Sequence, residues 1–272
     1  MELSKIIKLP SEIYNEEELE LNKINLFFGV NGSGKSHTLK QIQNQVPQSI
    51  IIDENRFFIS DLIATDAGNI NIAYIPSHNN LAKDTVLEEI NESFQQIFPN
   101  RKLVNISSIG SKNVVISIEK LGKSYSVGSD GRGIWNIIKP LEALVLCNEN
   151  TGVLIEEFSL GLYPGILTNY YELVKEKILN KNSFLVATTQ DPFVVYQFIK
   201  NKINDKFEWE NTDTDVSLFK FSEDGKGKIN IIRLDQDTSE TSLKELLGNY
   251  LDGIDIHKFS LLFSKPDERI SN

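Results

Sequence analysis

The sequence predicts an α/β protein in which helices flank a mostly parallel sheet and an antiparallel β lobe is attached. Short branched and aromatic runs alternate with stretches of helical periodicity, which is the order typical of a parallel sheet. Two further pairs of apolar runs are joined by turns that contain glycine, which predicts antiparallel hairpins. We expect a single domain over residues 1–272, with a core at about 24–198 and a hairpin and helical tail at about 205–272.

The first predicted unit is a strand, a glycine-rich loop and a helix. Residues 24–28, INLFF, have the character of a buried strand. From residue 36 to 46 apolar residues recur at helical spacing, and Pro47 ends the pattern. Further buried strands are predicted over residues 49–53, 71–76, 153–158 and 184–189, with a helix over 167–179 between the last two.

Capping and turn residues predict the remaining elements. A helix is expected to begin near Thr85, because Thr85 and Glu88 form a capping-box pair ahead of an apolar helical pattern. A second helical pattern follows a glycine-rich turn, and Pro140 predicts a kink or break in it. The other expected elements are a hairpin over 113–127 with its turn at 121–123, a hairpin over 216–234 and a short helix over 242–250.

Composition and charge narrow the classes of function. The formal net charge of -10 argues against a protein whose whole surface binds nucleic acid, although a local basic patch is compatible with it. Cys147 is the only cysteine, which excludes an internal disulfide and a multi-cysteine zinc site, and we expect it in the core. No apolar run approaches the roughly 20 residues that span a bilayer. We therefore expect a cytoplasmic protein without a signal peptide or membrane contact.

The segment GVNGSGKS has the spacing of a phosphate-binding loop: glycine, four residues, glycine, lysine and serine. Backbone N–H groups would face phosphate oxygens, Lys35 would reach the β and γ phosphates, and Ser36 would ligate Mg²⁺. A chance glycine-rich turn is the alternative, which the flanking strand and helix disfavour. The expected nucleotide-binding residues here are Gly29, Asn31, Gly32, Ser33, Gly34, Lys35, Ser36 and His37, with a solvent or packing role for the His37 side chain.

A second chemical signal is VLIEEF, in which a buried strand delivers Glu156 and Glu157 to its end. In phosphoryl transfer, one carboxylate holds Mg²⁺ and another orients or polarises the attacking water. We therefore expect Glu156 to ligate the metal and Glu157 to activate water, with Lys35 as a further catalytic residue. An exposed acidic turn is the alternative interpretation.

The order of these motifs resembles the ABC-type ATPases of the SMC, RecF and OLD-nuclease group. The phosphate loop is followed by a glycine-rich turn, a strand with paired acids, GLYP at 161–164 and TTQDP at 188–192. VLIEEFSLGLYPGIL is similar to the OLD-type segment of strand, Asp-Glu and Gly-Leu-His-Pro turn. The resemblance covers about residues 24–198 and implies an ABC-like P-loop NTPase fold with ATP and Mg²⁺ as cofactors.

The resemblance also implies how two copies would meet. SDGRG, which begins at Ser129, corresponds to the family's signature motif, which contacts the γ-phosphate bound by the partner subunit. Ser129 and Gly131 are therefore expected to bind nucleotide across an ATP-dependent homodimer. A serine and glycines at a helix N-terminus can also form an anion-binding site, independently of the resemblance. A plain glycine turn before a helix is the open alternative.

Three positions depart from the family pattern. Glu156 stands where the family usually has aspartate, so a longer carboxylate would hold the metal. Gln190 follows the threonine pair where the family has a switch histidine. It can donate a hydrogen bond to a γ-phosphate or water but cannot be charged, and it is the third expected catalytic residue. Asn79 or Asn80 could substitute for the Q-loop glutamine, and together these departures predict slow turnover.

Two function hypotheses follow. The leading one is an ATPase that drives or switches a DNA-transaction or phage-defence process, with a separate effector protein and DNA as a candidate partner. The alternative is an interaction module that binds ATP tightly and hydrolyses it rarely, which Gln190 and Glu156 favour. A transporter ATPase subunit is disfavoured because the sequence has no LSGGQ-like string, and a small-molecule kinase because the paired acids have no obvious role there.

Two further features have a plain and a functional interpretation. Tyr14 lies upstream of the loop, where an aromatic ring could stack on adenine, although a core or surface tyrosine is the simpler expectation. Positive charge gathers around the first hairpin, which a solvated face explains, but a nucleic acid would be sought there first. The residues concerned are Lys112, Lys120, Lys123 and Arg132.

Overall fold

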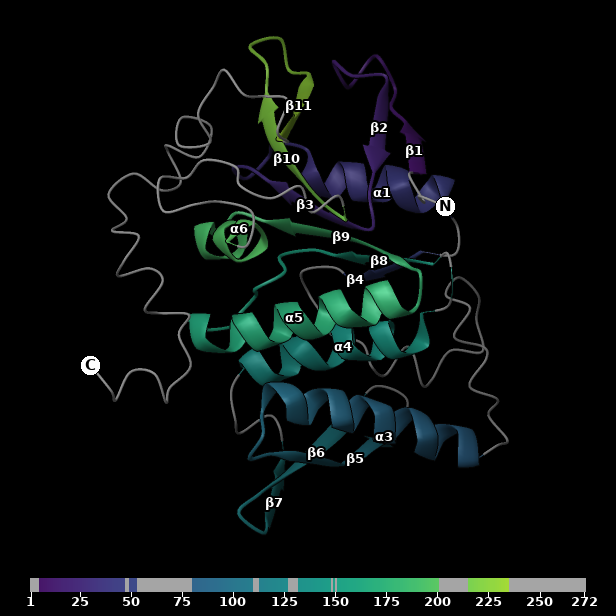
Figure 1. The fold of residues 1–272 in the computed structure, drawn as a ribbon, viewed down its shortest axis with the longest axis vertical. Helices are drawn as coiled ribbons and strands as arrows, with labels where there is room; N and C mark the ends of the chain where they lie inside the picture. Colours follow the sequence, from purple (N-terminus) through teal and green to yellow (C-terminus); the bar gives the residue numbers. More distant parts are fainter. Residues whose placement is uncertain are drawn as a thin grey trace, which may run out of the picture.

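The computed structural model shows a molecule built on a six-stranded sheet (Figure 1). The structure describes residues 5–46, 49–52, 80–109, 113–126, 132–147, 149, 151–200 and 215–234. The strand order is β11-β10-β3-β9-β8-β4, and all neighbours are parallel except β10 and β11. The strands are β3 Ile24–Phe28, β4 Ile50–Ile52, β8 Gly152–Ile155, β9 Phe184–Thr189, β10 Val216–Glu223 and β11 Ile229–Leu234.

The central strand β3 is buried on both of its faces, as is typical of a parallel strand. Ile24, Leu26 and Phe28 contribute to one hydrophobic cluster and Phe27 to another, as the period-two alternation of a strand requires. The two clusters lie on opposite faces of the sheet. The sheet is therefore the middle layer of the molecule, and the loop that follows β3 emerges from the middle of its edge.

Helices cover both faces of the sheet (Figure 1). Helix α1 packs on one face, where the β1–β2 hairpin adds to the same cluster. Helices α4, α5 and α6 pack on the other face. The bounds of these elements are α1 Lys35–Gln45, α4 Arg132–Leu146, α5 Pro164–Asn180, α6 Pro192–Ile199, β1 Lys5–Lys8 and β2 Glu18–Leu21.

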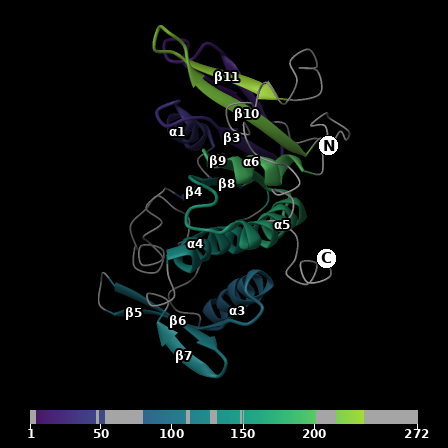
Figure 2. The same cartoon turned by 90° about the vertical axis from the view of Figure 1, so that its left-hand side faces the viewer.

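A separate three-stranded antiparallel sheet lies beyond these helices, at the opposite end of the molecule from β10 and β11 (Figure 2). Its order is β5-β6-β7, and α3 packs between it and the pair α4 and α5. The elements of this lobe are α3 Asn80–Ile97, β5 Lys102–Ile109, β6 Asn113–Lys120 and β7 Lys123–Ser126. The predicted class, a mostly parallel sheet flanked by helices with antiparallel β structure attached, is confirmed.

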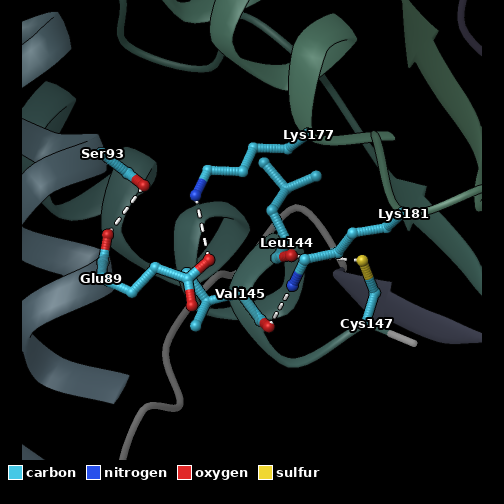
Figure 3. A network of polar contacts seen from close by, with 7 residues as sticks. All are labelled: Glu89, Ser93, Leu144, Val145, Cys147, Lys177 and Lys181. Atoms are coloured by element: carbon cyan, nitrogen blue, oxygen red, sulfur yellow. Dashed lines mark hydrogen bonds and ion pairs between the residues drawn. The ribbon is translucent and has the colours of Figure 1, made fainter. Parts of the chain in front are cut away.

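Polar contacts join α3, α4 and α5 (Figure 3). Lys177 of α5 pairs with Glu89 of α3, with 2.9 Å between the ammonium nitrogen and Oε1. Lys181 donates a hydrogen bond to the carbonyl oxygen of Val145 in α4. Cys147 is buried beside them, and burial raises the pKa of its thiol. Its predicted place in the core is confirmed.

The predicted start of one helix is wrong, and so is the predicted break in another. Helix α3 begins at Asn80, so Thr85 and Glu88 lie inside the helix rather than forming a capping box at its start. The four residues between Asn80 and Thr85, Leu-Ala-Lys-Asp, include three good helix formers, which extend the helix toward its N-terminus. Helix α4 also continues through Pro140 rather than breaking there. Its buried apolar face outweighs the loss of one backbone hydrogen bond.

Four elements were not predicted from the sequence, namely β1, β2, β5 and α6. The second predicted hairpin exists, but its strand β10 also pairs in parallel with β3 and so belongs to the central sheet. The predicted strand over 71–76 and helix over 242–250 lie outside the described residues. No helix in the described ranges combines the length and the apolar character that crossing a membrane requires.

Candidate functional site

The loop at residues 29–34 joins the carboxyl end of β3 to α1, and two of its glycines are required by their surroundings. Gly34 caps α1 with a left-handed backbone, φ 97°, and a Cβ there would collide with the side chain of Ile229 in β11. A Cβ on Gly29 would collide with the carbonyl oxygen of Phe221 in β10. The glycine spacing seen in the sequence thus reflects close packing against the second hairpin as well as turn geometry.

Lys35 places a buried cation at the centre of this loop. Its ammonium group donates hydrogen bonds to the carbonyl oxygens of Gly29 at 2.7 Å and Val30 at 2.9 Å. Only 6% of the residue is exposed. Burial lowers the pKa of Lys35, and the carboxylate of Glu157 opposes that fall. The lysine is therefore electrostatically linked to the acid that follows β8.

The N-terminus of α1 has the character of an anion site. The N-cap residue of α1, Gly34, provides no side-chain hydrogen bond to the helix, and the first turn of α1 contains no acidic residue. The first N–H groups and the positive end of the helix dipole are therefore not neutralised from within the helix. Ser36 and His37 are both exposed at this end, and His37 lies against Gln41 with 3.4 Å between their side-chain nitrogens. A phosphate group fits these donors.

The paired acids follow β8 and differ in their backbone. Glu156 is 9% exposed, and its N–H donates to the carbonyl oxygen of Ile52 at 2.8 Å, which continues the pairing of β8 with β4. Glu157 is half-buried and left-handed, with φ 47°. Such a conformation is uncommon for a residue other than glycine and is often found at functional sites.

Hydrogen bonds from the end of β9 hold Glu157 in this conformation. The hydroxyl oxygen of Thr188 accepts from the Glu157 N–H at 3.0 Å, and the Thr188 carbonyl accepts from the Phe158 N–H at 2.9 Å. The side-chain amide of Gln190 donates to Oε1 of Glu157 at 3.3 Å. The turn is thus fixed through its backbone and through the carboxylate itself.

Two more contacts attach this turn to helices. Ser159 donates to the carboxylate of Asp191 at 3.0 Å, and Asp191 also caps α6. Asn136 of α4 donates to the carbonyl oxygen of Leu160 at 2.8 Å. Of the segment 188–192 only Gln190 was predicted to act in the site, and Thr188, Asp191 and Asn136 were given no role from sequence. An aspartate before proline is a signal for a helix cap and could have revealed Asp191. The partner of Asn136 is not predictable from local sequence.

Three of the predicted site residues are linked in the structure, because Gln190 donates a hydrogen bond to Glu157 and the Glu157 carboxylate acts electrostatically on Lys35. Ser36 and Glu156 lie at the same edge of the sheet, because each follows the carboxyl end of a parallel strand. Among the described residues, there is no cluster of three or more His, Cys, Asp or Glu side chains that could hold a metal ion.

The remaining candidates fall elsewhere. Ser129, Gly131 and Asn79 lie outside the described residues, and Asn80 is described only as the first residue of α3. Tyr14 is a core residue, 1% exposed, whose hydroxyl lies 3.1 Å from Oγ1 of Thr38 in α1. The buried side chain therefore packs against helix α1 and is not available to stack on a base.

Comparison with known proteins identifies the fold. No protein-family model matches the chain, and no curated protein matches it. An SMC head bound to the C-winged helix domain of ScpA is 11% identical, over 87% of this chain and 98% of that one, with a TM-score of 0.50. The SMC head domain from Thermotoga maritima is 12% identical, over 85% and 97%, with a TM-score of 0.50.

A transporter component has a similar fold. CbiO1 from Clostridium perfringens, part of the ABC transporter complex cbiONQ, is 12% identical over 94% of this chain and 97% of that one, with a TM-score of 0.50. At these identities the likeness is one of fold. The chain therefore has the fold of the ABC-type P-loop ATPases, which is shared by SMC heads and transporter cassettes.

Proposed function

We propose that this chain is an ATPase that binds and hydrolyses ATP with Mg²⁺. The observation that carries the proposal is the convergence of Lys35, Glu157 and Gln190 at the carboxyl edge of the parallel sheet. A buried cation, a preorganised carboxylate and a neutral hydrogen-bond donor are the groups that phosphoryl transfer requires for positioning and charge stabilisation.

The residues at this edge suit the nucleotide and its metal. ATP with Mg²⁺, when bound, supplies the phosphoanhydride bond and the metal charge that stabilises its cleavage. The hydroxyl of Ser36 and the carboxylate of Glu156 are oxygen ligands of the kind that Mg²⁺ prefers. Lys35 and the uncapped N–H groups of α1 would hold the phosphates.

Glu157 is the residue that we assign to water activation. Its backbone is fixed by Thr188 and its carboxylate by Gln190, so little reorganisation is needed when it accepts a hydrogen bond from water. Gln190 remains neutral across the physiological pH range and would orient Glu157 or the water without competing for the proton.

We further propose an ATP-dependent homodimer in which Ser129 and Gly131 contact the nucleotide of the partner copy. Helix α4 begins directly after that turn, and its Asn136 is bonded to the loop that contains Glu157. A contact made at the turn would thus reach the water-activating residue of the same copy. Loss of the γ-phosphate contact after hydrolysis would then release the dimer.

The cellular role that we assign is that of a cytoplasmic OLD-like or SMC-like ATPase in DNA transactions or phage defence. One of the similar SMC heads is bound to a domain of another protein. We propose that this chain likewise acts through a separate effector, with DNA as a second partner. A slow-turnover switch module is the alternative, and the hydrogen bond from the uncharged Gln190 to Glu157 favours it.

The decisive experiment is the solution mass of the Glu157→Gln variant, measured by light scattering with and without Mg-ATP. The variant should bind ATP, hydrolyse it at a small fraction of the parental rate, and double its mass only with ATP. Glu176→Gln, which changes an exposed carboxylate in the second half of α5, is the matched control and should turn over normally. A monomer with ATP bound would reject the homodimer and favour the switch module. Hydrolysis near the parental rate would reject the role of Glu157.

A further inference from the structure

The turn between β6 and β7 contains a leucine in a conformation that leucine disfavours. Leu121 and Gly122 have φ values of 53° and 74°, so both central residues of this two-residue turn are left-handed. Turns of this kind favour Asn, Asp or Gly at the first central position, because a larger side chain crowds the backbone there. Leu121 is nevertheless present, and 89% of it is exposed.

The two residues that flank the turn are both exposed lysines. Lys120 and Lys123 lie directly opposite each other in the register of the hairpin, so their side chains project from the same face. Like charges in directly opposed positions destabilise a hairpin. The adjacent Glu119 is opposite Ser124 and belongs to the other face by the alternation of the strand.

The turn of the second hairpin, between β10 and β11, has features that stabilise it. At the tip between β10 and β11, the carboxylate of Asp224 accepts hydrogen bonds from the N–H groups of Lys226 and Lys228 at 2.8 and 2.9 Å. Glycine occupies the left-handed position there, at Gly227 with φ 83°. The tip at Leu121 shares a left-handed glycine, Gly122, but it has an apolar residue at its first central position and opposed positive charges on either side. The leucine and the paired lysines do not stabilise the turn, so they suit a role outside it.

The position of the tip suits a contact with a large partner. The β6–β7 turn lies at the extreme end of the molecule along its longest axis (Figure 1), and the second view agrees (Figure 2). The chain as a whole carries a net charge of -10, which repels a polyanion from its body. A projecting tip with two lysines can approach a polyanion while the acidic body stays at a distance.

We propose that the tip formed by residues 120–123 docks on duplex DNA. Leu121 would act as an apolar wedge against a base step, and Lys120 and Lys123 would contact the phosphates on either side. Proteins that kink DNA from the minor groove combine such an apolar wedge with cationic side chains. The proposal deepens the DNA-related role given above, but it does not depend on nucleotide binding by this chain.

Other partners fit the tip less well. One exposed leucine offers too little apolar area for stable membrane binding, which requires a larger apolar face or further anchors. Lysine is depleted at protein interfaces, and leucine is under-represented among the residues that dominate their binding energy. A wedge in DNA, in contrast, requires only one apolar side chain with positive charge beside it.

Fluorescence anisotropy with a labelled duplex, in the absence of ATP, tests the proposal. Leu121→Asn should weaken binding roughly tenfold, since the wedge is lost while the turn keeps a residue suited to it. The double variant Lys120→Gln/Lys123→Gln should lower the slope of log K against log salt by about 1.8, for two phosphate contacts. The matched controls, Ile6→Asn and Lys226→Gln, remove an exposed apolar residue and a hairpin-tip lysine elsewhere and should bind like the parent.

A second readout tests the wedge directly. A duplex that carries 2-aminopurine should brighten when the parent chain unstacks a base step, and it should not do so with Leu121→Asn at saturating protein. Unchanged affinity and unchanged fluorescence in the tip variants, or no duplex binding by the parent, would overturn the proposal. Tip-dependent binding to phosphatidylserine vesicles without duplex binding would assign the tip to membranes instead. Because ATP is absent throughout, the outcome with the tip variants tests this proposal without testing the ATPase, whose failure the Glu157→Gln experiment would show separately.

Discussion

Glu157 and Leu121 both have a left-handed backbone, but the regions around them treat this conformation differently. The turn at Glu157 is held by two hydrogen bonds to Thr188 and one from Gln190, all from a neighbouring strand end. The turn at Leu121 is flanked by opposed lysines, and its side chain is exposed.

The difference shows two ways in which a fold can retain an unfavourable conformation. At the edge of the central sheet, tertiary contacts maintain the strained residue, and the result is a carboxylate with a fixed position. At the hairpin tip, the exposed Leu121 keeps its unfavourable backbone without burying its side chain, and that side chain can contact a partner. The first arrangement suits chemistry and the second suits recognition, and the following predictions separate them in order of expected effect.

The largest effect on ligand binding should come from Lys35→Ala. Removing a charge-assisted phosphate contact of up to about 3 kcal/mol should raise the Kd for ATP roughly 100-fold. Leu121→Asn should leave that Kd unchanged, because the tip lies in another lobe. Calorimetric titration with ATP measures both. Normal affinity in Lys35→Ala would reject the phosphate-loop assignment, and weaker affinity in Leu121→Asn would show that the two regions are coupled.

The buried carboxyl of Glu142 in α4 is a third unfavourable feature. Its cost is the burial of a charge, which protonation relieves, rather than a strained backbone. Burial raises its pKa from the ordinary 4.5 to about 8, and Lys139 opposes the shift. Since the folded state binds this proton more tightly than the unfolded state, the contribution to stability is complete below pH 4.5 and is lost as the pH rises toward 8.

The free energy of unfolding should therefore fall by roughly 2–4 kcal/mol between pH 5 and pH 8, at about 1.4 kcal/mol per pKa unit. Glu142→Gln should flatten this dependence, because the amide does not titrate. Urea denaturation over that pH range measures the two slopes. Parallel slopes in parent and variant would show that Glu142 is not the group responsible.

Thr188→Val tests whether tertiary contacts maintain the turn at Glu157. The variant leaves the Glu157 N–H without its acceptor, which should lower the free energy of unfolding by roughly 1–3 kcal/mol. ATP turnover should fall with it, while the KM for ATP changes little, because the phosphate loop is intact. Thr188→Ser keeps the hydroxyl and is the control. Equal behaviour of the valine and serine variants would mean that the hydrogen bond does not position Glu157.

The smallest effect concerns the hairpin tip in the free protein. Leu121→Asn should stabilise the chain by roughly 0.5–1 kcal/mol, because asparagine tolerates a left-handed backbone. The reciprocal change, Asn182→Leu, places leucine at another left-handed position, φ 49°, and should destabilise by a similar amount. Chemical denaturation measures both. A loss of stability in Leu121→Asn would show that the leucine supports the fold and that its exposure is incidental.

The sequence by itself determined the local features of this protein. The glycine-rich loop between β3 and α1, the strand before it and the paired acids after β8 were all predictable, because each depends on residue types at short, regular spacing. The turn at 121–123 was predictable for the same reason. The predicted helix start near Thr85 and the predicted break at Pro140 were wrong, because packing and the propensity of neighbouring residues outweighed a cap signal and a helix breaker.

Only the tertiary structure decided which of these local features meet. The pairing of β10 with β3, the bond from Thr188 to Glu157 and the bond from Asn136 to Leu160 join segments that are far apart in the chain. Their partners are selected by the order of strands in the sheet, which no local pattern encodes. The left-handed backbone of Glu157 likewise persists because of those contacts, since glutamate alone does not favour it.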